Sequence, residues 1–186
     1  MVAEELLGKY LVRRQGDELQ AAMISETEAY IGPEDLACHG RFGCTPRTAV
    51  MFGPAGHWYV YLIYGMYWML NVVTDGEGHP AAVLLRGAGP WTGPGRLTRD
   101  MAIDKSLNGA RAERASGLWI EDRGFVVPET AIQATPRIGI DYAGPWKDKP
   151  YRFVLRELPA TQSPPVPRRD TRALGATASG AQRSRP

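Results

Sequence analysis

Two acidic side chains, Glu26 and Glu28, stand two residues apart in the stretch SETEAYIGPEDLACHG, which also contains Tyr30 and His39. In an extended chain alternate side chains share one face, so both carboxylates and the ring of Tyr30 would lie together. A carboxylate beside aromatic rings can act as a general base that takes a proton from an attacking water. Acids at strand ends are also commonly just solvated, so the spacing alone leaves catalysis and solvation both open.

A second stretch, HWYVYLIYGMYWMLN at residues 57–71, contains four of the chain's eight tyrosines and two of its five tryptophans. Tyr64 and the glycine after it predict a turn, which places Tyr64 at the tip of a hairpin. A tyrosine there either folds back over the core or is received by a partner. Tyr59, Tyr61 and Ile63 share one face of the preceding strand, and rings gathered on a face suit flat ligands such as nucleobases.

Strands are the main elements expected to position these residues. Alternation of apolar side chains predicts one hairpin from residues 10–14 and 19–30 across the turn QGDE, and a second from 58–63 and 68–74. Further strands are expected at 81–86, 117–122, 134–140 and 150–156, with short helices at 4–8, 33–39 and 95–103. At 186 residues and 44% apolar, the chain is long enough for one domain with a real core.

Length and composition argue against several classes of protein. The longest nearly uninterrupted apolar run, residues 58–73, has an internal glycine and is shorter than the roughly 20 residues that cross a bilayer. The N-terminus carries adjacent acids and no apolar segment with a cleavage site, so we expect no secretory signal and a cytoplasmic location. Cys38 and Cys44 lack the further ligands of a zinc site, and a disulfide is not expected in a reducing compartment. We expect neither metal nor cofactor.

The basic charge of the chain is concentrated at its C-terminal end. Residues 159–186 contain five arginines and one aspartate, a net charge of +4, whereas residues 1–158 contain 17 basic and 19 acidic side chains. The segment is rich in Pro, Ser, Ala and Gly and has no apolar periodicity, which predicts a disordered basic tail after a folded domain at 1–158. The tail is either a solubilising extension or an electrostatic tether to a polyanion.

Six segments between about Glu5 and Arg156 occur in an order that resembles the alkyladenine DNA glycosylase family, also called the 3-methyladenine or methylpurine DNA glycosylases. They are LLGKYLVRR, ISETEAYIGPEDLACH, TPRTAVMFGPAGHWYVYLIYGMYWMLNVVT, AAVLLR, GPGRLT and TPRIGIDYAG. The resemblance implies an α+β fold, a single compact domain around a curved antiparallel β-sheet with a protruding β-hairpin and peripheral helices.

The implied activity is that of a monofunctional DNA glycosylase, which initiates base excision repair. Such an enzyme rotates a damaged purine out of duplex DNA and hydrolyses its bond to the sugar. The implied substrates are 3-methyladenine, 7-methylguanine, hypoxanthine and ethenoadenine. The implied partner is double-stranded DNA that contains damaged purines, bound by a monomer that is associated with the nucleoid through DNA. No membrane partner is expected.

The resemblance also implies which residues carry the chemistry. Glu28 would be the general base, and its charge would stabilise the oxocarbenium-like transition state. Arg86 would help to hold the water and the local phosphate-sugar geometry. Tyr64 would be the wedge that enters the minor groove and fills the gap left by the flipped nucleotide. Apart from the resemblance, we expect Arg47 and Arg96 to contact DNA phosphates, because basic side chains are common on a DNA-facing surface.

The base pocket is expected between Tyr30 on one wall and Tyr61 with His39 on the other, with Asn71 at the floor, where it would crowd the exocyclic amino group of guanine. Many alkylated purines are cationic, so stacked rings would favour them by cation–π attraction. The matching pocket segments contain no lysine to form a Schiff base, which favours hydrolysis without strand cleavage.

The sequence departs from the family pattern in one segment, and two functions other than that of a glycosylase stay open. Only Trp91 and Thr92 separate the segments LLRGAGP and GPGRLT, where the family has a longer charged segment, so some DNA contacts are in doubt. A binding module that recognises damaged DNA without chemistry would not need Glu28. A carbohydrate hydrolase also uses paired acids and aromatic platforms, but it would not need a wedge at a hairpin tip.

Overall fold

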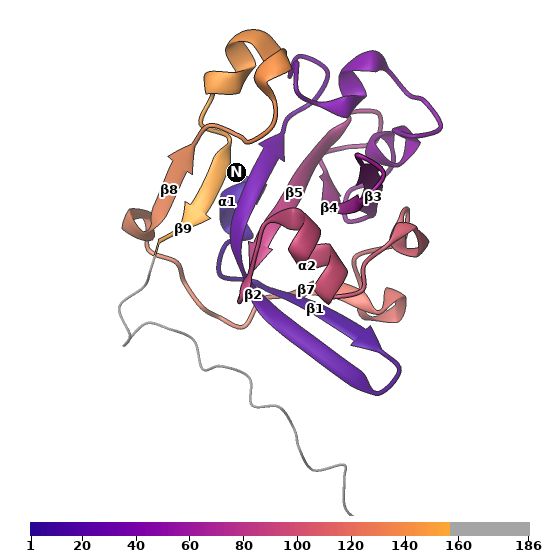
Figure 1. The fold of residues 1–186 in the computed structure, drawn as a ribbon, viewed down its shortest axis with the longest axis vertical. Helices are drawn as coiled ribbons and strands as arrows, with labels where there is room; N and C mark the ends of the chain where they lie inside the picture. Colours follow the sequence, from indigo (N-terminus) through magenta and orange to yellow (C-terminus); the bar gives the residue numbers. More distant parts are fainter. Residues whose placement is uncertain (157–186) are drawn as a thin grey trace, which may run out of the picture.

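The computed structural model describes residues 1–156, and its main element is a nine-stranded sheet in which every strand pairing is antiparallel (Figure 1). Six strands follow the order β3-β4-β5-β2-β1-β7, while β9 pairs with β2, β8 with β9, and β6 with β5. The strand bounds are β1 Tyr10–Gln15, β2 Glu18–Tyr30, β3 Trp58–Ile63, β4 Tyr67–Thr74, β5 Ala81–Ala88, β6 Trp91–Thr92, β7 Leu118–Glu121, β8 Ile132–Thr135 and β9 Arg152–Leu155. With few helices around one sheet, the predicted α+β single domain is confirmed.

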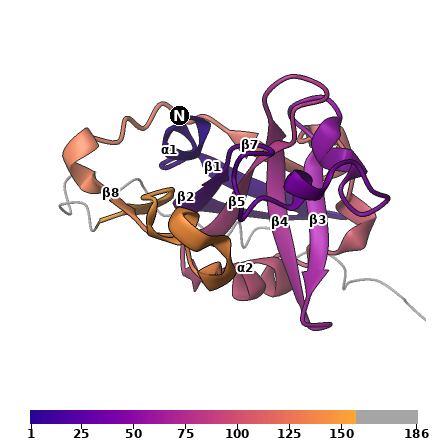
Figure 2. The same ribbon diagram turned by 90° about the horizontal axis from the view of Figure 1, so that it is seen from above.

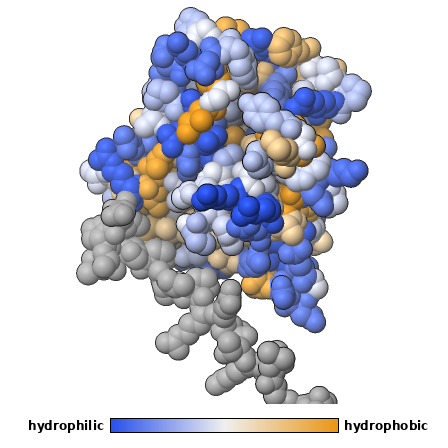
Figure 3. Space-filling view, in the orientation of Figure 1, coloured by the Kyte–Doolittle hydropathy of each residue, from blue (hydrophilic) through white to orange (hydrophobic). Residues whose placement is uncertain are grey.

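The helices of the described chain are short. The α-helices are α1 (Val2–Glu5) and α2 (Pro94–Asp100), and the 3-10 helices are η1 (His39–Phe42), η2 (Ala49–Phe52), η3 (Lys105–Leu107), η4 (Arg114–Ser116), η5 (Glu129–Ala131) and η6 (Asp141–Asp148). In Figure 1, α2 lies across the sheet in front of β2 and β5. On the face shown in Figure 3, apolar residues form small groups among hydrophilic ones.

The main core forms because alternate residues of several strands point to the same side of the sheet. Leu11, Ile24, Trp58, Leu70 and Leu85 are all fully buried in one cluster. The N–H of a buried indole usually finds an acceptor, and Trp58 Nε1 donates to the carbonyl of Leu118 at 3.0 Å. This contact ties β3 to β7, at the opposite end of the strand order.

Strand β2 is the axis of the domain because it pairs along both of its edges. Its first half pairs with β1, and its second half lies between β5 on one edge and β9 on the other. The register passes from Ile24↔Ala88 to Glu26↔Gly87 and then to Thr27↔Leu85. Ser25 and Arg86 are therefore bulge residues, and bulges typically redirect side chains near functional sites.

The β3–β4 hairpin projects from the body of the domain, as Figure 2 shows. The predicted turn is confirmed: Tyr64 and Gly65 have φ values of 53° and 67°, and the N–H of Met66 donates to the carbonyl of Ile63 at 3.1 Å. Two consecutive residues with positive φ are typical of a type I′ turn. A tyrosine is unfavourable in this conformation, and such backbone strain is often found at functional sites.

The helix predicted at 33–39 is wrong: the chain forms turns there and then the 3-10 helix η1. The cause is Asp35, whose carboxylate accepts hydrogen bonds from the N–H groups of Ala37 at 3.0 Å and Ile31 at 3.4 Å. Side-chain bonds of this kind compete with helical backbone bonds.

The predicted bounds of three other elements are also corrected. The strand expected at 134–140 is β8, which ends at Thr135 because the next residue, Pro136, has no N–H for the ladder. The helix expected at 95–103 is α2, which ends at Asp100, and the φ of 47° at Ala102 is incompatible with continuation. The helix expected at 4–8 is α1, at Val2–Glu5.

Within residues 1–156, no helix is long and apolar enough to cross a membrane. The predicted basic tail, residues 159–186, lies outside the residues that the structure describes.

Candidate active site

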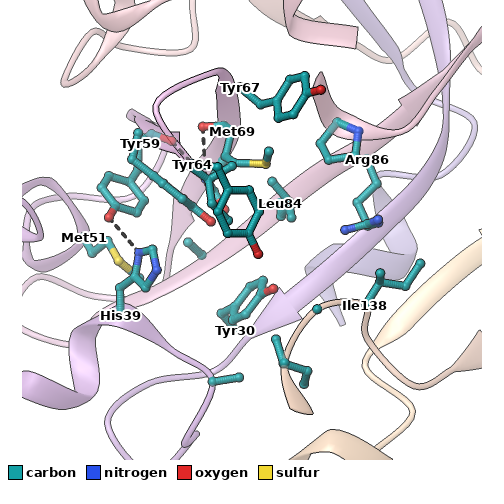
Figure 4. A pocket seen from close by; sticks show the side chains of 18 of the residues that line it. Tyr30, His39, Met51, Tyr59, Tyr64, Tyr67, Met69, Leu84, Arg86 and Ile138 are labelled. Atoms are coloured by element: carbon teal, nitrogen blue, oxygen red, sulfur yellow. Dashed lines mark hydrogen bonds between the residues drawn. The ribbon is translucent and has the colours of Figure 1, made fainter. Parts of the chain in front are cut away.

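A cavity of about 350 Å³ lies beside the projecting hairpin, between strands β3, β4 and β5, the end of β2 and the loop after β8 (Figure 4). This volume falls in the range of small-molecule sites, roughly 300–1,000 Å³. The lining residues are mostly aromatic and aliphatic: Tyr30, Ala37, His39, Met51, Tyr59, Tyr61, Ile63, Tyr64, Tyr67, Met69, Asn71, Ala82, Leu84, Arg86, Pro94, Ile138, Gly139, Ile140 and Tyr142.

Glu28 lies behind this lining and is fully buried. Its Oε1 accepts a hydrogen bond from the N–H of Ile138 at 2.8 Å and is 3.3 Å from Arg86 Nη1, and its Oε2 accepts from the Tyr30 hydroxyl at 2.9 Å. An ionised carboxylate offers about four lone-pair directions, so one further donor can be accommodated. Burial raises the pKa of Glu28, and the charge of Arg86 opposes that rise.

Arg86 is the only residue of the described chain that both lines the cavity and forms an ion pair with Glu28. It comes from the bulge of β5, and its side chain is mostly buried. A guanidinium remains charged under all ordinary conditions, so it provides a fixed positive charge between the carboxylate and the cavity.

The aromatic walls predicted from the sequence lie together. Tyr30 comes from the end of β2, and Tyr61 lies on β3 with its ring 4.6 Å from that of His39 and 5.2 Å from that of Tyr59. Tyr59 and Tyr61 share one face of β3, as predicted, and this face lines the cavity, whereas Trp58 on the other face lies in the main core.

His39 is neutral at neutral pH. Burial, together with the nearby charge of Arg47, lowers its pKa to about 4. Its Nδ1 is 2.9 Å from the hydroxyl of Tyr59, and burial raises the pKa of that hydroxyl to about 12. The wall therefore presents polar atoms without a net charge.

Arg137 is a site residue that the sequence reasoning did not identify. Its guanidinium is fully buried, donates to Asp35 Oδ1 at 2.8 Å, and lies 4.7 Å from the centre of the Tyr30 ring. The pair thus supports the outer face of Tyr30 and brings the next residue, Ile138, to Glu28. Arg137 belongs to the segment TPRIGIDYAG, one of the six that carry the family resemblance. Because a strand was predicted at 134–140, nothing in that prediction indicated the contact between Arg137 and Asp35.

Asn71 lies on β4 and lines the cavity with 3% of its surface exposed. Its Nδ2 donates to the backbone carbonyls of Tyr59 at 3.1 Å and Met69 at 3.4 Å. These bonds fix the amide within its own hairpin.

The predicted DNA-contacting residues lie on the surface. Tyr64 is 78% exposed at the hairpin tip and also lines the mouth of the cavity. Arg47 is exposed, with its guanidinium 5.4 Å from the centre of the Tyr61 ring. Arg96 is exposed on α2 and does not line the cavity, although Pro94 on the same helix does.

The short segment at Trp91–Thr92 is strand β6, which folds back on β5 in a tight hairpin.

Among residues 1–156, no group of three or more His, Cys, Asp or Glu side chains could hold a metal ion. Cys38 is buried, with its thiol 3.2 Å from the carbonyl of Pro80, and Cys44 is exposed.

This arrangement combines a buried carboxylate for proton transfer with a cavity walled by neutral rings, which suits a flat ligand and a hydrolytic reaction. Comparison with known proteins identifies the class. The family model described as methylpurine-DNA glycosylase matches residues 1–159. The chain belongs to this family, and it is a DNA glycosylase, a hydrolase that cleaves N-glycosidic bonds.

The chain is similar to relatives that carry the name "Putative 3-methyladenine DNA glycosylase", among them proteins of three genera. The chain is 50% identical to the one from Anaeromyxobacter sp. (strain Fw109-5), over 83% of this chain and 82% of that protein. It is 47% identical to the one from Myxococcus xanthus, over 91% of each, and 46% identical to the one from Legionella pneumophila (strain Corby), over 86% of this chain and 90% of that protein.

Proposed function

We propose that this chain rotates a damaged purine out of duplex DNA and hydrolyses its bond to deoxyribose with a water activated by Glu28. The observation that carries this proposal is the environment of Glu28, a fully buried carboxylate that is held by three donors directly behind the cavity wall. A base with a raised pKa and a fixed position is suited to accept a proton in the transition state.

The proposed reaction uses the residues in distinct roles. The purine stacks between Tyr30 and the wall of Tyr61 and His39, while water binds at the remaining position on Glu28. Water attacks the anomeric carbon as the glycosidic bond breaks; Glu28 takes its proton, and the bonding electron pair leaves with the purine. The negative charge of Glu28 also stabilises the oxocarbenium-like sugar, and Arg86 orients the water.

We propose both cationic and neutral lesions as substrates: 3-methyladenine, 7-methylguanine, hypoxanthine and ethenoadenine. The rings favour a cationic base by cation–π attraction. However, guanidinium groups already lie 4.7 Å from the Tyr30 ring and 5.4 Å from the Tyr61 ring. These guanidinium groups repel a cationic base and so reduce its binding advantage over a neutral one. We therefore include the neutral purines hypoxanthine and ethenoadenine among the proposed substrates.

Double-stranded DNA is the proposed partner, and we propose that the protein acts as a monomer at the nucleoid, with Tyr64 filling the space vacated by the purine. The exposed Arg47 and Arg96 would contact phosphates. The described residues that line the cavity include no lysine to form a Schiff base, in keeping with hydrolysis without strand cleavage.

The proposal is tested with four duplexes of one sequence, each with one of these lesions. We expect single-turnover release of the free base from all four and none from an undamaged duplex. Binding to the lesions without release of any base would instead favour the damaged-DNA binding module.

Asn71→Ser should extend release to guanine. Guanine differs from hypoxanthine by the amino group at carbon 2, and a pocket excludes such a group by crowding it or by leaving it unpaired. The shorter side chain makes room at the floor. We expect measurable release of guanine from a mismatch, where opening is easiest, with hypoxanthine release retained within about tenfold.

Retained hypoxanthine release serves as the control for folding, because Asn71→Ser also removes the two bonds to the hairpin backbone. A variant that is active on hypoxanthine but leaves mismatched guanine intact would show that another side chain excludes guanine.

A further inference from the structure

Glu26, the other acid of the β2 pair, has no role in the reaction as proposed above. Its side chain is 14% exposed, and it is not among the residues that line the cavity. One oxygen, Oε1, accepts hydrogen bonds from Arg86 Nε at 2.9 Å and from Arg152 Nε at 2.6 Å. Because β5 and β9 flank β2, an arginine from each neighbouring strand converges on this single carboxylate oxygen.

Arg86 contacts two acids with different parts of one rigid group. Its Nε bonds Glu26, and its Nη1 lies 3.3 Å from Glu28 Oε1. A guanidinium is planar with its N–H groups in a fixed fork, so holding Nε determines the direction of Nη1. Arg86 also lies at the bulge, where the regular ladder that would otherwise define its direction is interrupted.

We propose that Glu26 is a positioning residue that holds the Arg86 guanidinium in the orientation in which it faces Glu28. For catalysis the inference rests on the proposed function, because Arg86 and Glu28 are the groups that would orient and activate the water. For the free protein it rests only on the contacts of Glu26, Arg86 and Arg152.

Glu26 has two opposite effects on the ionisation of Glu28. Its own negative charge disfavours ionisation of a neighbouring carboxyl, whereas an Arg86 that is correctly oriented favours it. A substitution that removes the charge of Glu26 but leaves Arg86 in place should therefore lower the pKa of Glu28. A substitution that keeps the charge but lets Arg86 turn away from Glu28 should raise that pKa. From β2, β3 and the loop after β8, the side chains of Tyr30, Tyr61 and Arg137 and the N–H of Ile138 also face Glu28; none of them bonds Glu26, so they stay constant in this comparison. Arg152 of β9 bonds Glu26 Oε1 itself, so its contact changes together with that of Arg86.

Two conservative substitutions separate these effects. Glu26→Gln keeps an acceptor oxygen at the same distance and removes the charge. Glu26→Asp keeps the charge and withdraws the oxygen by one methylene, so it can no longer reach Arg86 Nε in the same geometry. The exposed Glu34→Gln is the matched control for loss of a surface acid.

The measurement is a carbon-13 NMR titration of the Glu28 side-chain carboxyl in the free protein, assigned by its absence in Glu28→Gln. We expect the pKa of Glu28 to rise by about one unit in Glu26→Asp, to fall by a smaller amount in Glu26→Gln, and to stay unchanged in Glu34→Gln. The pH below which the rate of single-turnover base release falls should shift in the same direction as the pKa in each variant.

An unchanged or lowered pKa in Glu26→Asp would overturn the inference, since Glu26 would then act only as a background charge. The titration does not depend on catalysis. Opposite shifts in the two variants of a protein that releases no base would support the positioning role and reject the proposed function.

Discussion

Glu28→Gln is expected to bind lesion-containing duplexes as the wild type does and to lose base release by at least about 100-fold. The glutamine amide can occupy the same space and keep the bond from the N–H of Ile138, but it cannot accept a proton from water. Single-turnover release at saturating enzyme separates this loss from any change in affinity. Glu34 is an exposed acid in the turn after β2, and Glu34→Gln is the matched control that should retain full activity.

The pH dependence provides a second readout of the same residue. Burial raises the pKa of Glu28, and only the ionised form can accept a proton. Wild-type release should therefore fall as the pH decreases through this raised pKa, at a higher pH than for an ordinary glutamate. Glu28→Gln should lack this acidic limb. If Glu28→Gln still released the base rapidly, or still lost activity at acidic pH as the wild type does, Glu28 would not be the general base.

Tyr64→Ala should give the second-largest loss, roughly 10-fold or more on a paired lesion. Stacking of an aromatic ring on a base is worth about 1–3 kcal/mol, and without the ring the flipped state is less populated. A lesion that is already unpaired costs less to extrude, so its release should be much less affected. The comparison requires single-turnover rates on the same lesion in a duplex and opposite a gap.

Tyr64→Phe is the matched control, because it keeps the ring and loses only the hydroxyl, and it should behave almost like the wild type. Equal losses in Tyr64→Ala on paired and unpaired lesions would mean that the ring only covers the cavity mouth. We expect the turn to be kept in both variants, because Gly65 supplies its second residue with positive φ.

Local patterns in the sequence were sufficient to predict the two hairpins and the aromatic face of β3 that lines the cavity. Alternation along residues 58–63 separated Tyr59 and Tyr61 from Trp58, and the structure places them in the cavity and the core respectively. Tyr30, His39, Asn71 and Arg86, chosen through the family resemblance, line one cavity with Tyr61. Their catalytic and binding roles stay predictions.

Contacts between distant segments could not be predicted in the same way. Asp35 and Arg137 are 102 residues apart, and their buried pair turns a predicted helix into turns and carries the loop after β8 to Glu28. Glu26 and Arg152 are 126 residues apart and meet only because β9 adds to the edge of β2. Periodicity describes which face a side chain occupies, but it contains no information about which strand lies alongside.

The most direct test of the central claim is to identify the products formed by the wild-type protein on a duplex with one 7-methylguanine. Mass spectrometry should detect the free purine in an amount equal to the abasic sites formed, with the strand intact until alkali is added and with no protein–DNA adduct after borohydride treatment. Tight binding without free purine would contradict the claim of hydrolysis, and an adduct trapped by borohydride would contradict attack by water.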